Sequence, residues 1–267
     1  MKDVSFAGPI PEVYARRLVP LLFEPYALDL AARVAESAPR DVLETAAGTG
    51  VVTRALRARL PDTRLVATDL NQAMLDQARA HGAAPARVVW QAADALALPF
   101  EAASFDAVVC QFGTMFFSDK VAGHREARRV LRPGGRLFFS VWAELAANDF
   151  ARTVHEAVAE VFPGDPPRFI ARVPHGYAEP DAIRADLEGA GFEDIAIETV
   201  EARSHAESAR DAALAFCQGT PLRAEIEARD AAKLDEATDC AAEALAKRFG
   251  THAIEGRLRA FVATARR

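Results

Sequence analysis

The chain has 267 residues, enough for one large α/β domain with additions or for two small domains. Its composition, 51% hydrophobic and 26% charged, is that of a folded globular protein and excludes extended disorder. The formal net charge of −6 argues against a sequence-independent nucleic-acid binder, which needs a positive face to meet phosphates.

The cysteines and the first residues indicate the compartment. Cys110, Cys217 and Cys240 lie far apart without C-x-x-C spacing, so we expect reduced thiols and neither a disulfide framework nor a zinc site. The N-terminus lacks the apolar core of a signal peptide, and no apolar run approaches the roughly 18 residues that span a bilayer. We therefore expect a cytoplasmic protein without a membrane span.

Strands alternate with helices from about residue 25 to residue 142, which is the pattern of a parallel sheet covered on both faces. Apolar runs between turn signals predict strands at 41–45, 64–69, 87–92, 105–111 and 136–142. Periodic segments predict helices at 25–38, 51–60, 71–81 and about 119–131.

The regular alternation ends after residue 142. We expect an amphipathic helix at 148–162, a helix at 180–190, a strand at about 195–202, helices over 207–248 and a last strand at about 253–265. A helical segment between the last two strands is most simply an insertion that covers the cleft at the carboxyl ends of the strands. Packing without ligand contact is the alternative.

A strand ending in Glu44 runs into a turn that contains Gly48 and Gly50, and a helix starts directly after it. Such a turn presents backbone N–H groups to a nucleotide-like ligand, and its glycines allow conformations that a Cβ would strain. Glu44 is unfavourable beside a pyrophosphate but suits a ligand with an amino group and a sulfonium charge. Since Thr53 stands where the dinucleotide pattern has a third glycine, the loop favours S-adenosylmethionine over NAD.

Acids also end the next two predicted strands. Asp69 can accept both hydroxyls of a ribose, or it can cap the helix that begins at Asn71. Asp94 can accept from an exocyclic amine while the Ala95 N–H donates to a ring nitrogen, or it can be a solvated loop acid. Met74 can pack on a purine or belong to the core. Acids at successive strand ends would line one edge of one cleft.

Five segments in chain order resemble the motifs of class I S-adenosylmethionine-dependent methyltransferases, and most closely those of the methyltransferase type 11, ubiquinone/menaquinone-biosynthesis-like branch. They are Glu44–Gly50, Thr68–Leu75, Ala93–Phe100, Ser104–Asp106 and Arg129–Gly135, and the resemblance covers roughly residues 40–142. It implies a doubly wound, Rossmann-like α/β fold with a seven-stranded, mostly parallel sheet, an antiparallel last strand and helical insertions over the carboxyl-end edge.

The resemblance also implies a set of residues around the methyl donor. Ala46 and Gly48 would contact the methionine moiety through the backbone, with Glu44 under the loop near the amino group. Gly50 would also belong to the cofactor-binding residues. Asp69 would bind the ribose, whereas Asp94 and Ala95 would read the edge of the adenine. Leu70 and Met74 would pack on the adenine, and Gln111 and Phe112 would line the sulfonium side. Ala46 departs from the motif, which has glycine at that position.

The chain before the sheet has a role that the residues leave open. Residues 14–23 look like the segment that closes over the cofactor in such enzymes, and Tyr14 and Arg17 could reach the cofactor carboxylate. An amphipathic helix packed on the domain, with Arg16 and Arg17 solvated, is equally consistent. We expect residues 1–24 to form this covering segment, and residues 25–267 to form the methyltransferase domain with substrate-covering insertions at about 143–180 and 205–250.

Methyl transfer is an in-line displacement at a carbon activated by positive sulfur, so alignment matters more than a strong catalytic motif. Weak candidates for a base are His155, His175 and Tyr177, each with a structural role as the alternative, while His124 is expected at the surface. No metal-binding pattern is recognisable in the sequence, which disfavours magnesium-assisted chemistry.

Apolar residues in the predicted insertions favour a small, partly apolar acceptor over nucleic acid, namely Phe150, Phe162, Phe169, Phe216 and Leu222. We expect a monomer or a homodimer. One alternative function is a non-catalytic adenosylmethionine-binding regulatory protein. The other is an NAD(P)-dependent oxidoreductase, which Glu44, the missing third glycine and the absence of a Tyr-x-x-x-Lys pair disfavour.

Overall fold

The computed structural model describes residue 6 and residues 8–81 and 88–267. By its internal contacts the chain divides into two units, which are described separately. Unit 1 holds the chain up to Phe23 together with Ala143–Gly176 and Glu201–Arg259. Unit 2 holds Glu24–Trp142, Tyr177–Val200 and Ala260–Arg267.

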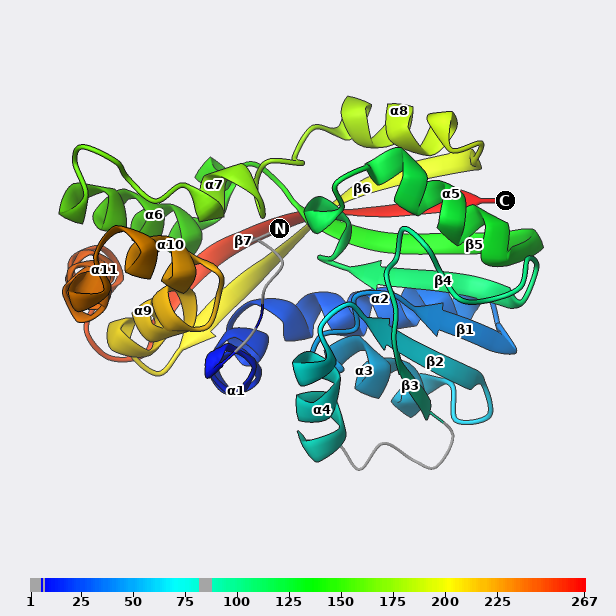
Figure 1. Ribbon diagram of the computed structural model, residues 1–267, viewed down its shortest axis with the longest axis horizontal. Coiled ribbons are helices and arrows are strands. Elements are labelled where there is room, and N and C mark those ends of the chain that lie inside the picture. The colour runs from blue at the N-terminus through cyan, green and yellow to red at the C-terminus, as the bar shows by residue number, and fades with distance from the viewer. Residues whose placement is uncertain (1–5, 7, 82–87) are drawn as a thin grey trace. The chain divides into compact units, whose positions relative to one another are not determined.

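A seven-stranded sheet with the order β3-β2-β1-β4-β5-β7-β6 dominates unit 2 (Figure 1). Its strands are β1 (Asp41–Glu44), β2 (Arg64–Asp69), β3 (Val88–Ala92), β4 (Phe105–Gln111), β5 (Leu131–Trp142), β6 (Glu193–Ala206) and β7 (Ile254–Arg266). Pairs from β3 to β5 are parallel, whereas β7 runs antiparallel to β5. The predicted doubly wound sheet with an antiparallel last strand is confirmed. Residue 87, the predicted start of β3, lies outside the described residues.

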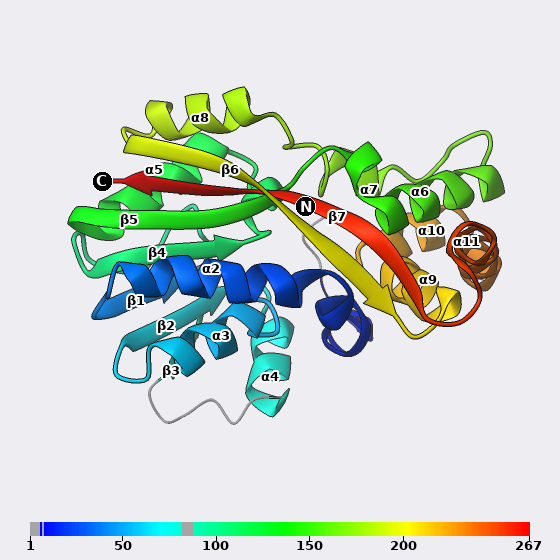
Figure 2. The ribbon, with the colours of Figure 1, turned by 180° about the vertical axis from the view of Figure 1, so that it is seen from behind.

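Helices cover both faces of this sheet, as the two opposite views show (Figures 1 and 2). One face carries α2 (Glu24–Glu36) and α3 (Val51–Arg59), and the other carries α5 (Lys120–Val130) and α8 (Pro180–Gly189). Between β2 and β3 the chain forms α4 (Gln72–His81), and after β4 it forms the short η3 (Thr114–Phe116). The start of α5 is capped by Asp119, whose Oδ1 accepts from Ala122 N at 2.8 Å.

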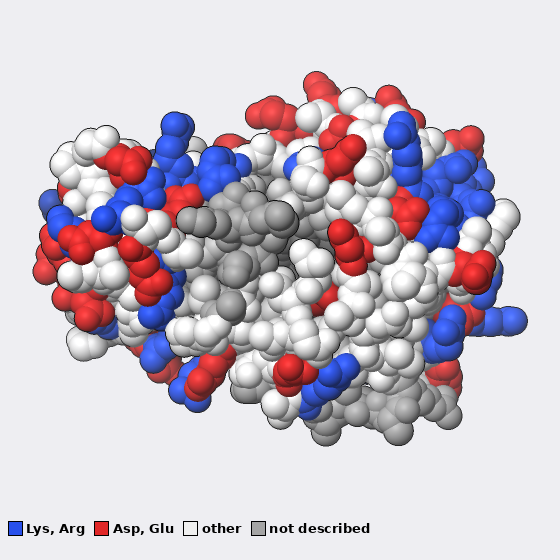
Figure 3. All heavy atoms as spheres, in the orientation of Figure 1, with Lys and Arg blue, Asp and Glu red and all other residues white. Residues whose placement is uncertain are grey.

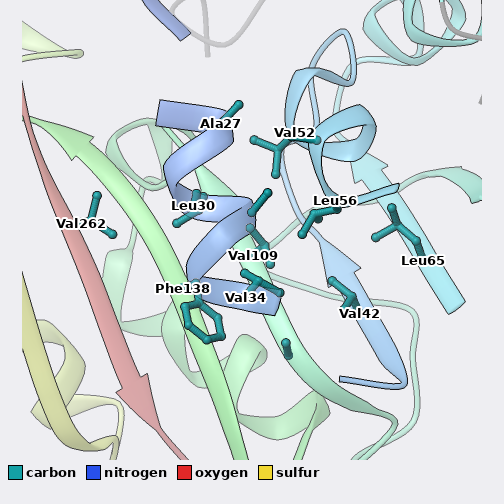
Figure 4. Close-up of a cluster of buried hydrophobic side chains, with 13 residues drawn as sticks. Ala27, Leu30, Val34, Val42, Val52, Leu56, Leu65, Val109, Phe138 and Val262 are labelled. Atoms are coloured by element: carbon teal, nitrogen blue, oxygen red, sulfur yellow. The ribbon is translucent and has the colours of Figure 1, made fainter. Parts of the chain in front are cut away.

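The core of unit 2 fills the space between the sheet and α2 with α3 (Figure 4). Apolar residues recur at helical spacing on α2, so that Ala27, Leu30 and Val34 all face the sheet and are fully buried. From the strands, Val109 and Phe138 meet them. Because this core holds the strands in register, it also fixes the carboxyl ends on which the site is built.

The start of β5 differs from the sequence-based expectation. A turn at Gly134-Gly135 predicted a strand from residue 136, but β5 begins at Leu131 because that residue pairs with Phe105. The register then shifts before Ala107 pairs with Arg136. With a φ of 79°, Gly134 takes up the irregularity inside the strand.

Unit 1 is mainly helical (Figure 1). Its longer helices are α6 (Asp149–Val161), α9 (Ala209–Gln218), α10 (Leu222–Asp230) and α11 (Leu234–Phe249). Shorter elements are α1 (Ile10–Val13), η4 (Leu145–Ala147), α7 (Phe169–Arg172) and η5 (Ala231–Lys233), and Tyr14–Phe23 forms the π-helix η2. The predicted helices over 148–162 and 207–248 are therefore confirmed.

Local contacts explain how unit 1 holds together. The Phe150 and Phe249 rings meet edge to face at 5.1 Å between centroids, which joins α6 to α11. Arg248 and Arg257 both bond to Asp149, the first residue of α6. The predicted role of these segments as covers for a substrate stays a prediction. Within the described residues, no helix has the length and apolarity needed to cross a membrane.

Candidate cofactor site

The loop after β1 turns sharply through left-handed backbone conformations. Ala46, Gly48 and Gly50 have φ values of 51°, 56° and 79°. At Gly50 a Cβ would also lie 2.8 Å from Cη2 of Trp90, so only glycine fits there. Ala46 adopts a left-handed conformation in spite of its Cβ, which gives a physical reason why the family motif has glycine at this position.

Neighbouring strands hold this loop through backbone hydrogen bonds. Thr45 N donates to Val109 O on β4, and Ala47 N donates to Thr68 O on β2, both at 2.9 Å. Gly50 N then donates to Ala47 O at 2.9 Å, which closes the turn into α3. These backbone bonds to β2 and β4 therefore position the loop.

The Asp69 carboxylate, at the end of β2, is 6% exposed and joins two segments. Its Oδ2 accepts from the N–H of Gly48 and its Oδ1 from the N–H of Asn71, both at 2.8 Å. The bond to Asn71 forms a local turn before α4, which begins at Gln72, and so differs from the helix cap weighed as an alternative. The bond to Gly48 links this acid to the loop. Burial raises the pKa of Asp69, and the two N–H groups oppose that rise.

Glu44 is 2% exposed and lies at the end of β1. Its Oε2 accepts from Thr53 Oγ1 on α3 at 2.5 Å. Burial raises the pKa of Glu44 to about 8, with Arg54 opposing the rise and Asp69 adding to it. In this state the carboxyl is largely protonated at neutral pH. A cation brought close to it would favour the carboxylate, whereas a phosphate would not.

The residues predicted for the adenine lie at the ends of β2 and β3. Ala93 N donates to Asp69 O at 3.0 Å, which ties the two strand ends together. Leu70 is 55% exposed, whereas Met74 is buried at 3%. Asp94 is exposed and its Oδ1 accepts from Leu96 N at 2.9 Å, while Ala95 is half-buried. Leu70 and Asp94 thus present accessible groups at this edge, and Met74 forms part of its floor.

The residues predicted for the sulfonium side follow β4. Gln111 pairs with Ser140 on β5, and the next residue, Phe112, still donates its N–H to Ser140 O at 3.0 Å. Phe112 then has a φ of 51°, an outlier for a bulky side chain. Its ring stacks on Trp142 with 3.9 Å between centroids and 11° between planes. The sequence analysis did not select Trp142, although the aromatic run that ends β5 was its signal.

The two predicted cover residues belong to unit 1 and have partners there. The Tyr14 ring stacks on Phe23 with 5.3 Å between centroids. Arg17 forms an ion pair with Asp211 on α9. Their predicted role at the cofactor carboxylate stays a prediction.

Among the base candidates, His175 in unit 1 has Nδ1 2.8 Å from Ala143 O, and burial lowers its pKa to about 4. Burial also lowers the pKa of His155. In unit 2, Tyr177 is buried and its hydroxyl donates to Asp186 Oδ2 at 2.8 Å, while burial raises its pKa. Tyr177 therefore already directs its proton to a carboxylate.

The prediction that His124 lies at the surface is wrong. The side chain is 2% exposed on the face of α5 that packs on the sheet, with its ring 5.1 Å from that of Phe139. Burial lowers its pKa to about 4, so the ring is neutral at physiological pH. Helical spacing placed this residue on α5 but did not reveal which face the sheet would cover.

A hollow of about 1020 Å³ lies at the opposite, amino-terminal edge of the strands, where its lining includes Asp41, Asp106 and Arg132. Arg132 bonds to both acids and Arg64 also bonds to Asp41, so both carboxylates are already paired with arginines. Open α/β sheets bind ligands at the carboxyl ends of their strands. The residues of unit 2 that are predicted to bind the methyl donor lie at these carboxyl ends, whereas the hollow lies at the amino-terminal edge.

Comparisons with known proteins agree with this geometry. A family model described as a methyltransferase domain matches residues 42–135. The demethylmenaquinone methyltransferase of Deinococcus radiodurans is 44% identical over 108 residues, which are 40% of this chain and 45% of that protein. The demethylmenaquinone methyltransferase of Thermus thermophilus is 34% identical over 176 residues, which are 62% of this chain and 79% of that protein. The match spans less than half of the first relative and most of the second.

A solved structure shows the same fold. The YcgJ protein from Bacillus subtilis superposes with a TM-score of 0.58 at 18% identity, covering 91% of this chain and 98% of that one. Together with the Thermus relative and the loop held between β2 and β4, this similarity shows that the chain belongs to the class I S-adenosylmethionine-dependent methyltransferases, in their ubiquinone/menaquinone-biosynthesis-like branch.

Proposed function

We propose that this protein transfers the methyl group of S-adenosylmethionine to a small, partly apolar molecule by in-line displacement. The observation that carries the proposal is the hydrogen bond between the Gly48 N–H and Asp69 beside the buried Glu44. This bond connects the sharply turned loop after β1 to the acid at the end of the adjacent strand β2. Open α/β sheets bind nucleoside ligands at such carboxyl ends.

In this proposal each residue of the edge has one task. The backbone of Ala46, Gly48 and Gly50 approaches the methionine part, and Asp69 accepts from the ribose. The adenine lies between Leu70 and Met74, with Asp94 and Ala95 at its edge. Gln111 and Phe112 line the sulfonium side, and Tyr14 and Arg17 cover the carboxylate.

The chemistry of Glu44 fits this donor. The group is buried and its pKa is raised to about 8, so a nearby positive charge would be stabilised by ionisation of Glu44. A pyrophosphate at the same place would meet a carboxyl that repels it once ionised. The fit therefore favours adenosylmethionine over a dinucleotide.

When bound, S-adenosylmethionine supplies a carbon that is already activated by positive sulfur. The residues of the chain then have to hold the acceptor in line with that carbon, exclude water and receive any proton that the acceptor loses. His155, His175 and Tyr177 stay weak candidates for this base, because burial lowers the pKa of both histidines and the Tyr177 hydroxyl donates to Asp186.

We propose a quinone-like aromatic compound as the acceptor, because the Deinococcus and Thermus relatives are demethylmenaquinone methyltransferases. The surface supports a small molecule over nucleic acid. On the face drawn in Figure 3, acidic and basic side chains are mixed, apart from a group of Lys and Arg side chains near the C-terminus. A cytoplasmic location and a monomeric or homodimeric state stay predictions from the sequence.

Calorimetric titration with adenosylhomocysteine and, separately, with NADH tests the donor. We expect binding of adenosylhomocysteine alone, and tight binding of NADH without adenosylhomocysteine would contradict the proposal. A screen of quinone-like, phenolic, amine and lipid-like acceptors with methyl-labelled cofactor tests the transfer. Donor binding without transfer to any of them would favour the non-catalytic alternative.

A further inference from the structure

Three aromatic rings meet beneath the turn that follows β4. Phe112 stacks on Trp142, and Tyr26 on α2 meets both rings edge-on, with 5.4 Å between centroids in each case. All three side chains are buried, at 5%, 4% and 0% exposure. One stacked pair and two edge-to-face pairs are the favoured aromatic geometries, so the three rings restrain one another.

This cluster coincides with backbone strain. Phe112 has a φ of 51°, a conformation that a bulky residue adopts only when its surroundings impose it. The backbone bond from Phe112 N to Ser140 O fixes one side of the residue. The stacked Trp142 ring fixes the other, because the Phe112 side chain could leave this conformation only by breaking the stack.

The next residue carries the restraint to the loop after β1. A Cβ on Gly113 would overlap Cβ of Ala46 and lie 2.8 Å from Sγ of Cys110. The two loops are therefore in direct contact, and the path of the Phe112–Gly113 turn determines where the Ala46 backbone can lie. Both loops also bond to the sheet, at Ser140 and at Val109.

We infer that Trp142 and Tyr26 are positioning residues for the methyl donor: by holding Phe112 in its left-handed conformation, they fix the turn that sets the loop of Ala46. The inference rests on the proposed function, because that function assigns the Ala46 backbone and Phe112 to the donor. Neither ring needs to touch the donor for this role, since the effect passes through Phe112 and Gly113.

The test measures the dissociation constant of adenosylhomocysteine by calorimetry on folded variants. Trp142→Leu removes the stack, and we expect the affinity for adenosylhomocysteine to fall about tenfold. A loss of this size lies in the range of free energy that is typically stored as strain at a residue in such a conformation. Trp142→Phe keeps a ring in place and should stay near the wild-type value. Phe138→Leu is the matched control, because Phe138 is equally buried on the same strand but packs in the core shown in Figure 4.

A double variant separates positioning from general loss of packing. Glycine adopts left-handed conformations without help, so with Phe112→Gly in place the loss of Trp142 should change affinity little. The loss of adenosylhomocysteine affinity caused by Trp142→Leu is therefore measured in the wild type and in Phe112→Gly. Equal losses in the two proteins would overturn the inference.

The outcomes distinguish this inference from the function on which it rests. Wild-type protein that does not bind adenosylhomocysteine would overturn the proposed function. Wild-type binding with an unchanged constant in Trp142→Leu would overturn the positioning role alone. If Trp142→Leu does not fold, Tyr26→Leu takes its place in the same comparison, since it removes the ring that meets both others edge-on.

Discussion

The N–H of Gly48 donates to Oδ2 of Asp69 at 2.8 Å, so this bond ties the loop after β1 to the acid that ends β2. The same carboxylate accepts from Asn71 N at the start of the segment that leads into α4. Asp69 therefore organises the site in addition to any bond that it makes to a ribose, and changing it should affect both functions.

Replacement of Asp69 by alanine is expected to weaken binding of adenosylhomocysteine by about 1–3 kcal/mol, because charge-assisted hydrogen bonds to the donor and the bond to Gly48 are lost together. Calorimetric titration of the folded variant measures the change. Asp76→Ala, an exposed acid on α4, is the control. An unchanged dissociation constant in Asp69→Ala would remove Asp69 from the proposed donor site.

The contact between Gly113 and Ala46 gives a paired prediction for stability. Gly113→Ala should lower the free energy of unfolding by about 1–3 kcal/mol, since the added methyl group overlaps Cβ of Ala46. Ala46→Gly removes that Cβ and relieves the φ of 51°. Urea unfolding of both single variants and of the double variant checks this.

We expect Ala46→Gly to recover part of the loss caused by Gly113→Ala, the remainder reflecting the approach to Cys110 Sγ. Additive effects of the two changes would show that the two loops do not press on each other as the structure indicates.

The parts of the fold that depend on local signals could be predicted from the sequence. The positions of the strands along the chain follow from apolar runs between turn signals, and Gly48 and Gly50 mark a turn whose left-handed φ values only glycine adopts freely. Asp69 could be placed because it ends an apolar strand. These signals lie within a few residues of the structure that they determine.

Features that depend on long-range packing could not be predicted. Nothing near Trp142 in the sequence shows that its ring will stack on Phe112, because β4 and β5 bring them together. The start of β5 at Leu131 reflects pairing with Phe105, which overrides the local turn signal. His124 was misplaced for the same reason, since the sheet decides which face of α5 is covered.

The buried His124 should make the protein less stable in mild acid. In the unfolded chain the ring takes up a proton near pH 6.5, whereas in the folded chain it does so only near pH 4. The unfolded ring therefore binds more protons between these values, so the contribution of His124 to the free energy of unfolding rises with pH across this range.

His124→Leu should make the slope of the free energy of unfolding against pH less positive between pH 4 and 6.5 than in the wild type. It should change stability little at neutral pH, because Nε2 of His124 has no hydrogen-bond partner among the described residues. Urea unfolding of wild type and variant across the range measures both effects. His205→Leu, at an exposed site on β6, is the control. Equal slopes in wild type and His124→Leu would show that another group causes the acid sensitivity.

Glu44 should produce the opposite dependence at higher pH. The unfolded chain releases this proton near pH 4.5, but the folded chain holds it to about pH 8. The folded carboxyl binds more protons between these values, so the contribution of Glu44 to the free energy of unfolding falls as pH rises, by at most about 1.4 kcal/mol per pH unit. The buried histidines still lose protons in the unfolded chain near pH 6.5, so the contribution of Glu44 is obtained as the difference in slope between the wild type and a variant that lacks this carboxyl.

Glu44→Gln cannot ionise, and its amide keeps an oxygen that can accept from Thr53. We therefore expect the free energy of unfolding of the wild type to fall relative to that of Glu44→Gln as the pH rises from 6.5 to 8. Urea unfolding at both ends of the interval gives the two slopes, with the exposed Glu36→Gln at the end of α2 as control. If wild type and Glu44→Gln show the same slope of the free energy of unfolding against pH, Glu44 is already ionised in the folded protein. A carboxyl that holds no extra proton in the folded state adds nothing to this slope.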